Sequence, residues 1–197
     1  MNKYESIKRN FLSGKIKDCY RFFEKENYIV EAAYCDIILD RLDNARKKFS
    51  SVADIDIRAH WGLCILDMIA GNITVNPTYF EIRNFLEIDL SMLIMYCKGN
   101  YVENIIKYAN YMAYFNNECY KFLGRVFWAY NMMQPSMYFL NIAGDKMYND
   151  PELHYMLAYI YYTNENNIEK CRHELDSCLR LLPEYYPAMN LLNKIRN

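Results

Sequence analysis

Glycine and proline are scarce in this sequence, with six glycines and five prolines among 197 residues. Runs of alternating apolar and polar residues bounded by turns, which predict β-strands, are also missing. Apolar residues instead recur at intervals of three and four, as in Cys171, Leu175, Cys178 and Leu182. That spacing is typical of amphipathic helices, so the sequence predicts an all-α chain.

Long apolar runs and a dominant charge are absent as well. The most apolar stretch, residues 61–70, contains Asp67 and is about half as long as a membrane-spanning helix. The first twelve residues lack the apolar segment of a signal peptide. Lys and Arg number 23 against 24 Asp and Glu, whereas a nucleic-acid-binding surface is basic. We therefore expect a cytoplasmic protein with no membrane span and no nucleic-acid partner.

The cysteines form no pattern that predicts a disulfide framework or a zinc site. They are odd in number, widely spaced and without a Cys-x-x-Cys pair. We expect reduced thiols buried in the core, which fits a cytoplasmic compartment. The seven are Cys19, Cys35, Cys64, Cys97, Cys119, Cys171 and Cys178.

Polar stretches divide the chain into segments of about 10–15 residues, the length of helices that form antiparallel hairpins. Pro77 and Pro135 are expected in first helical turns, and Asp150 is expected to cap a helix that begins at Pro151. Left-handed C-caps are expected at Gly14, Gly71 and Gly99. The predicted helices are 2–12, 15–26, 28–39, 41–50, 55–70, 76–85, 87–97, 101–115, 117–131, 135–147, 151–163, 168–181 and 185–195.

Two consecutive helix pairs repeat in the C-terminal part. Matched positions are Leu123 with Leu157, Gly124 with Ala158 and Phe127 with Tyr161 at a spacing of 34, and Ser136, Leu140 and Ala143 with Cys171, Leu175 and Cys178 at a spacing of 35. Small residues at such positions let two helices approach closely. The positions that we expect to be buried are Leu123, Gly124, Leu140, Ala143, Leu157, Ala158, Leu175, Cys178 and Leu179.

This pattern resembles the tetratricopeptide repeat, a family of helix pairs of about 34 residues. Tyr120, His154 and Pro183 also fit the family's pattern. The match is good over 117–188, weaker over 85–116 and divergent before that. The resemblance implies an α-solenoid of antiparallel hairpins with a right-handed superhelix.

We expect the whole chain, 1–197, to form one helical-repeat domain. Its parts are divergent short hairpins in 1–84, clearer repeats in 85–183 and a capping helix in 184–197. A cap is needed because the last repeat would otherwise leave its apolar face in water. Leu191, Leu192 and Ile195 are expected to pack on the helix at 168–181.

In this family the first helix of each repeat lines a concave groove. Carried onto this chain, the resemblance implies a groove lined by Asp89, Leu93, Tyr96, Lys121, Arg125, Trp128, Tyr155, Tyr159 and Tyr162. Its aromatic residues would form a wall, with Lys121 and Arg125 supplying positive charge at one end. Such a groove suits a peptide with apolar anchors and one carboxylate. The alternative is that several of the tyrosines fill the interior of the solenoid.

Catalytic patterns are missing, with no phosphate-binding loop and no nucleophile elbow. His60 and Cys64 are one turn apart, so they share a helical face, where they could form a metal or thiolate site. We favour a packing histidine beside a core cysteine. The sequence therefore predicts no catalytic residue, no metal and no cofactor.

The leading hypothesis is a non-enzymatic interaction module that binds an unidentified peptide or protein segment in its concave groove. Three alternatives stay open. They are a small secretion-type chaperone that holds an apolar segment, an enzyme centred on His60 and Cys64, and a structural oligomerising unit.

Overall fold

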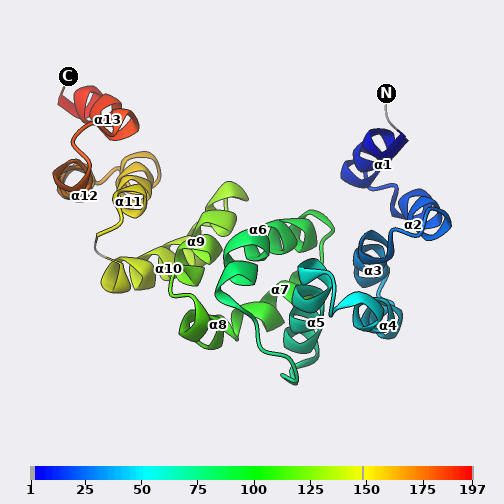
Figure 1. Ribbon diagram of the computed structural model, residues 1–197. Helices are drawn as coiled ribbons and strands as arrows, with labels where there is room; N and C mark the ends of the chain where they lie inside the picture. Colours follow the sequence, from blue (N-terminus) through cyan, green and yellow to red (C-terminus); the bar gives the residue numbers. More distant parts are fainter. Residues whose placement is uncertain (1–2, 148, 197) are drawn as a thin grey trace. The chain divides into compact units, whose positions relative to one another are not determined.

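A computed structural model describes residues 3–147 and 149–196. In this part of the chain there are thirteen α-helices and no strand, which confirms the all-α prediction (Figure 1). None of these helices combines the length and the apolar character that a membrane span requires. The helices divide between two compact units, residues 1–116 and residues 117–197.

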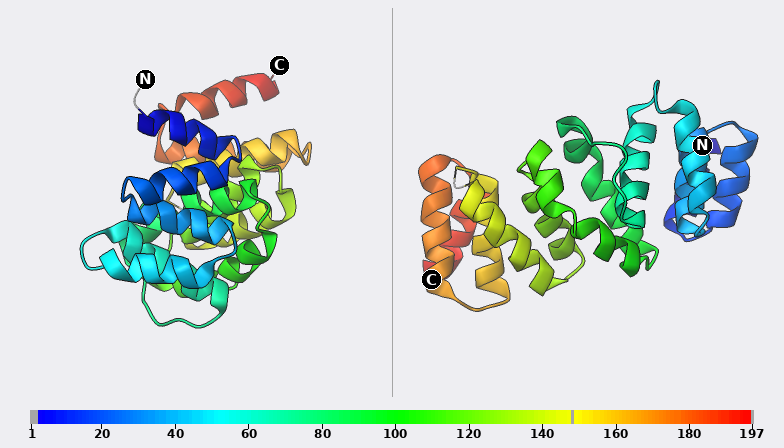
Figure 2. Two further views of the ribbon diagram at one scale, coloured as in Figure 1. Left: turned by 90° about the vertical axis from the view of Figure 1, so that its right-hand side faces the viewer. Right: turned by 90° about the horizontal axis from the view of Figure 1, so that it is seen from below.

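The N-terminal unit contains eight of the helices. Helices α1 to α5 each pack on the next along the chain, and Figure 2 shows α1 to α4 side by side in chain order. The largest buried side chains at this end include Phe49 and Trp61. The helices are α1 (Lys3–Leu12), α2 (Ile16–Lys25), α3 (Ile29–Ile38), α4 (Leu42–Val52), α5 (Ile57–Ala70), α6 (Tyr79–Met95), α7 (Gly99–Ile106) and α8 (Ala109–Phe115).

Helix α6 replaces two of the predicted helices. The expected break between 76–85 and 87–97 is absent, because no turn-forming residue interrupts the chain there. The proposed boundary between residues 84 and 85 consequently falls inside α6. The helix begins after Thr78, whose side chain and that of Glu81 form a reciprocal capping box. Pro77 therefore precedes the cap, and its expected place in the first turn was wrong.

The predicted helix 101–115 is interrupted. A turn in which the N–H of Tyr108 donates to the carbonyl of Ile105, at 3.0 Å, separates α7 from α8. The turn lets Ile105 and Met112, on different helices, both reach the core.

Several predicted helix ends are confirmed. Gly14 and Gly71 have φ angles of 79° and 77° at the ends of helices, and Asp150 accepts a hydrogen bond from the N–H of Leu153 at 3.1 Å. The expectation for Gly99 was wrong, because Gly99 begins α7 and the positive φ, 56°, falls on Cys97. That turn also leaves Cys97 exposed, whereas the other six cysteines are buried, and all seven are free thiols.

The C-terminal unit consists of two helical hairpins and a final helix. The helices are α9 (Cys119–Ala129), α10 (Met133–Lys146), α11 (Pro151–Thr163), α12 (Ile168–Leu181) and α13 (Tyr186–Arg196). Pro135 lies in the first turn of α10, as predicted. Helix α9 packs on α10 and α11 packs on α12, as expected for repeated hairpins.

The close helix contact predicted from the small residues is confirmed at Gly124. A Cβ atom there would lie 2.5 Å from Cγ of Leu140 and 3.2 Å from its backbone nitrogen. Every repeat position expected to be buried is buried except Leu179, which is half-exposed.

The predicted capping helix is present as α13, which packs on α12 and α11. Ala188 and Leu191 are buried, while Leu192 and Ile195 are half-buried. The guanidinium of Arg172 on α12 donates to the carbonyl of Ile195 at 3.2 Å. Helix α13 therefore covers apolar surface of the hairpin formed by α11 and α12.

Candidate functional site

The basic end of the predicted groove is neutralised in the C-terminal unit. Lys121 is 6% exposed, and its Nζ lies 2.6 Å from Oδ2 of Asp150 and 3.3 Å from Oε2 of Glu152. Arg125 contacts the other oxygen of Glu152 at 2.9 Å. The expectation that Lys121 faces a groove was wrong, because it is buried among acids. Both cations are thus paired with acidic residues of the same unit.

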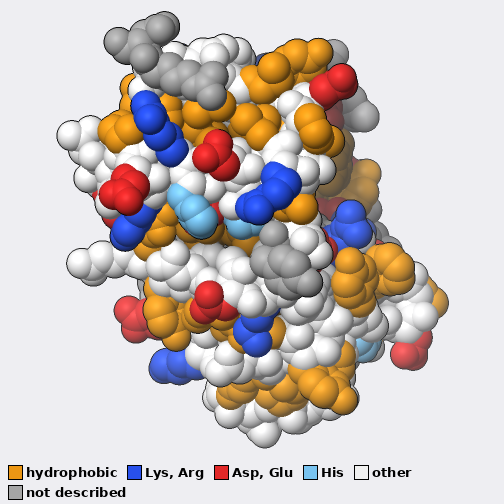
Figure 3. Space-filling view, turned by 90° about the vertical axis from the view of Figure 1, so that its left-hand side faces the viewer, with side chains coloured by type: hydrophobic (Ala, Val, Ile, Leu, Met, Phe, Trp, Pro, Cys, Tyr) orange, Lys and Arg blue, Asp and Glu red, His pale blue; other side chains and the backbone are white. Residues whose placement is uncertain are grey.

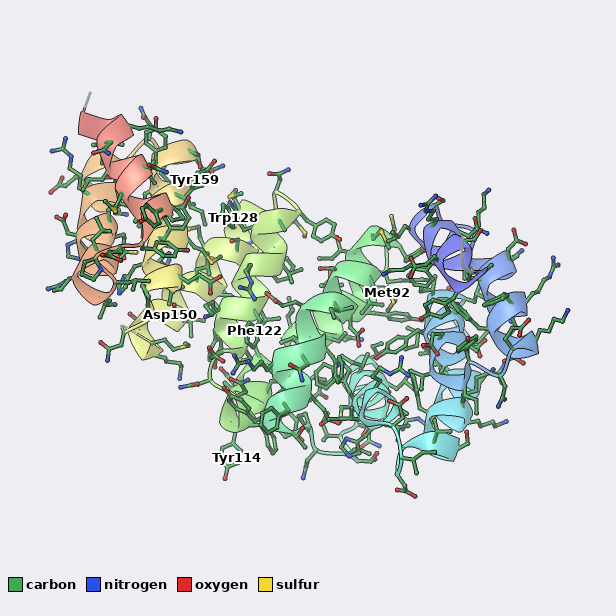
Figure 4. The ribbon with its side chains drawn as sticks, turned by 45° about the horizontal axis from the view of Figure 1, so that its top comes forward. Met92, Tyr114, Phe122, Trp128, Asp150 and Tyr159 are labelled. Atoms are coloured by element: carbon green, nitrogen blue, oxygen red, sulfur yellow. The ribbon has the colours of Figure 1, made fainter. Side chains whose placement is uncertain are left out.

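The aromatic residues expected in the same unit are partly brought together. The ring centroid of Tyr159 lies 5.6 Å from that of Trp128 and 6.1 Å from that of Tyr155. Tyr155 in turn contacts Tyr185, at 5.5 Å. Figure 4 labels Trp128 and Tyr159 on neighbouring helices. The rings of Trp128, Tyr159, Tyr155 and Tyr185 thus largely contact one another. Tyr162 is half-buried and is not a member of this group.

The face of the molecule drawn in Figure 3 has no large area of one charge. Figure 3 shows basic and acidic side chains scattered among hydrophobic ones over one face. This mixture agrees with the nearly balanced composition.

Two of the residues expected in the groove belong to the N-terminal unit and are held by its own helices. Leu93 is fully buried, so its expected groove-facing position was wrong. The ring of Tyr96 lies 5.3 Å from that of Phe11 on α1, and its hydroxyl donates to the carbonyl of Phe11. Both side chains therefore make contacts within the N-terminal unit.

Asp89, also expected to face a groove, does line a pocket in the N-terminal unit. The pocket has a volume of about 370 Å³ and is walled mainly by apolar side chains from α1 and α6. Figure 4 shows Met92 on the side of α6 that faces these N-terminal helices. The apolar lining consists chiefly of Phe11, Leu12, Phe23, Phe85, Ile88 and Met92.

Asp89 is the buried polar group of this pocket. Its side chain is 4% exposed, and its Oδ2 accepts hydrogen bonds from Nε1 of Trp61 at 2.8 Å and from the hydroxyl of Tyr34 at 3.1 Å. Both of these hydrogen bonds end on Oδ2. Burial raises the pKa of Asp89 to about 7, although the two donors oppose that shift. The carboxyl can therefore accept a further hydrogen bond from a bound group.

The charged residues beside the pocket are mostly paired. The guanidinium of Arg58 lies 2.9 Å from Glu31 and 2.8 Å from Asp56. Lys8, an exposed residue of α1, adds one amino group to the lining. The pocket is thus an apolar hollow with one buried acceptor and a mixed polar margin.

The His60 and Cys64 pair gains a third member from the fold. Nδ1 of His60 lies 2.6 Å from Oε1 of Glu81, and the donor atoms of His60, Cys64 and Glu81 all lie within 4.8 Å of one another. Burial, Glu81 and Asp67 raise the pKa of Cys64 to about 12. A thiol in that state stays protonated near neutral pH and is a poor nucleophile.

Sequence reasoning identified Asp89 and the His60–Cys64 pair but missed what surrounds them. The pocket walls come from α1 and α6, about 80 positions apart, and Glu81 lies 21 positions after His60. No local pattern singled out Asp89, because α6 also contains Glu81, Arg83 and Glu87. Comparisons of the chain with protein-family models, with curated proteins and with solved structures found no match.

Proposed function

We propose that this protein is a non-enzymatic interaction module, a tetratricopeptide-like solenoid that binds a segment of a partner protein. The repeat spacing and the close contact between Gly124 and Leu140 support the solenoid. The buried, protonated thiol of Cys64 supports a function without covalent catalysis.

The observation that carries the proposal is the apolar pocket between α1 and α6. Its volume, about 370 Å³, lies within the range of protein binding sites, about 300–1,000 Å³. Ile88 and Leu12 of its lining are each 63% exposed, so apolar surface continues out of the pocket. Exposed apolar patches of this kind mark sites of protein interaction.

The occupant is a short segment with apolar anchors and one hydrogen-bond donor. Apolar anchors fit the walls on α1 and α6, as when an amphipathic helix or peptide fills a groove. A side-chain N–H near the floor would donate to Oδ1 of Asp89. The carboxylate suggested by the sequence is not part of this occupant, because Lys121 and Arg125 are already paired.

Peptide selection tests the proposal. A displayed library of random peptides is selected against the purified chain, and the enriched peptide is measured by fluorescence anisotropy. Ile88→Asp should raise the Kd at least about tenfold, since an apolar anchor is worth about 1.5–3 kcal/mol and tenfold is about 1.4 kcal/mol.

Phe80→Asp is the matched control. Phe80 is 64% exposed on the same helix as Ile88 but does not line the pocket. This variant should bind the peptide as the wild-type protein does. A selection without enrichment, or a peptide that binds the Ile88→Asp protein equally well, would contradict the proposal.

A further inference from the structure

Two histidines form matching pairs with glutamates. Nδ1 of His60 lies 2.6 Å from Glu81, and Nδ1 of His154 lies 2.6 Å from Glu174. Among the residues that the structure describes, a thiol completes a group of possible metal ligands at the first pair only. His60, Cys64 and Glu81 are the one group of three or more metal-binding side chains brought together in the described residues.

The three side chains converge because of local helix geometry. His60 and Cys64 lie one turn apart on α5, so their side chains emerge on the same face. Glu81 is the third residue of α6, where the capping box fixes it. Its Oε2 accepts from the N–H of Thr78 at 2.7 Å and from the Thr78 hydroxyl at 2.9 Å.

This arrangement leaves the other oxygen of Glu81, Oε1, directed at His60. Carboxylates that bind metals are commonly held in this way, with one oxygen hydrogen-bonded to neighbouring groups and the other bound to the ion. Thr78 would therefore act as the positioning residue for Glu81. The capping box accounts for the position of Glu81, but it does not explain the thiol beside the His60–Glu81 pair.

An ion could reach the cluster from solvent. The side chain of His60 is 35% exposed, whereas that of Glu81 is nearly fully buried. His60, Glu81 and Thr78 line an open hollow of about 350 Å³, together with Asp54 and Asp56. The hollow supplies a route of entry and room for a water molecule as a fourth ligand.

We infer that His60, Cys64 and Glu81 form a binding site for a transition-metal ion of the zinc type. Imidazole and thiolate favour such ions, while magnesium and calcium require oxygen ligands. Three protein ligands plus one open position are the composition of an accessible zinc site rather than a closed structural one. The site differs from the packing histidine that the sequence favoured.

Binding has a defined proton balance. Zinc bonds of about 2.0–2.3 Å require Nδ1 of His60 and Oε1 of Glu81 to move apart from their hydrogen bond. The proton on Nδ1 moves to Nε2, and the proton of the Cys64 thiol is released to solvent, as metal binding to thiols requires. No oxidant or reductant is needed.

Cobalt(II) is the probe for the test, because a cobalt–thiolate bond gives a near-ultraviolet charge-transfer band. Chelator-treated protein titrated with Co²⁺ should develop this band with saturation at one ion per chain, and Zn²⁺ should abolish it. Cys64→Ser should remove the band. His60→Ala and Glu81→Gln should each lower the affinity at least about tenfold.

Two control variants distinguish this site from adventitious binding. His154→Ala removes the equivalent His–Glu pair, and Cys97→Ser removes the exposed thiol. Both should keep the band and its stoichiometry. Since His60 is partly exposed, His60→Ala should fold, which circular dichroism would verify. An absent or unsaturable band, a band lost with Cys97→Ser, or full affinity in folded His60→Ala would overturn the inference.

Discussion

Trp61 donates its indole N–H to Asp89 across 2.8 Å, and both side chains are buried. This bond joins α5 to α6 at the wall of the pocket, and Tyr34 adds a second donor from α3. Three helices therefore meet at one carboxyl group. Its protonation should affect stability.

Asp89 should make the protein less stable as pH rises. Burial raises its pKa from 3.8 to about 7, so the folded state binds a proton that the unfolded state has lost. The contribution of Asp89 to the free energy of unfolding is complete below pH 3.8 and is lost as the pH rises through about 7. The total loss is up to about 4 kcal/mol.

The measurement is urea unfolding of the wild-type and Asp89→Asn proteins at pH 5 and pH 8. The wild-type protein should lose stability relative to Asp89→Asn at the higher pH, since Asn cannot ionise. Asp43→Asn, at an exposed position, should show no such change. If the difference in unfolding free energy between the wild-type and Asp89→Asn proteins were the same at both pH values, Asp89 would not titrate in this range.

Gly124→Ala should destabilise the C-terminal unit by about 1–3 kcal/mol, and Gly124→Leu by more. The added Cβ would overlap Leu140, including its backbone nitrogen at 3.2 Å, which cannot move aside freely. Gly144→Ala is the matched control, because its Cβ would meet Leu157 only at 3.7 Å. The control should be neutral or stabilising, since alanine favours helix by about 1 kcal/mol. Equal midpoints of chemical denaturation for the two variants would contradict this.

Removal of the capping helix by truncation after Pro183 should cause aggregation or a lower Tm. The truncation exposes the surface of α12 and α11 on which α13 packs. Leu191→Asp should act in the same direction, because burial of such a side chain is worth about 1.5–3 kcal/mol. Met189→Asp, at an exposed position of the same helix, should leave the Tm nearly unchanged. Size-exclusion chromatography and thermal unfolding check these outcomes, and a soluble truncated protein with the wild-type Tm would refute them.

Asp67 should hold the loop between α5 and α6 in place. Its Oδ2 accepts from the N–H of Val75 at 3.0 Å and from the Thr74 hydroxyl at 2.6 Å, while Arg46 contacts Oδ1 at 2.7 Å. Burial acts to raise the pKa of Asp67, but these partners bring it below 3.8. The carboxylate thus stabilises the fold above that pH and loses this effect as pH falls.

Asp67→Ala should speed proteolytic cleavage within residues 71–78, as read by mass spectrometry of limited digests. The exposed Asp54→Ala is the control and should be cleaved at the wild-type rate. Unchanged cleavage in Asp67→Ala would mean that the loop is held by other contacts.

Features that depend on neighbouring residues in the chain could be read from the sequence. The helical period, the Asp150 cap and the left-handed turn at Gly71 follow from nearby side chains and backbone preferences. The close helix approach at Gly124 was also predicted from its small size, whereas the structure identified Leu140 as the residue it meets.

Features that depend on distant residues were decided by the tertiary structure. The sequence alone could not show that Lys121 would meet Asp150 and Glu152, or that Leu93 would point into the core. The physical reason is that periodicity specifies an apolar face but not the helix that covers it. The same holds for the pocket between α1 and α6 and for Glu81 beside His60, where residues far apart in the chain become neighbours only after the helices have packed.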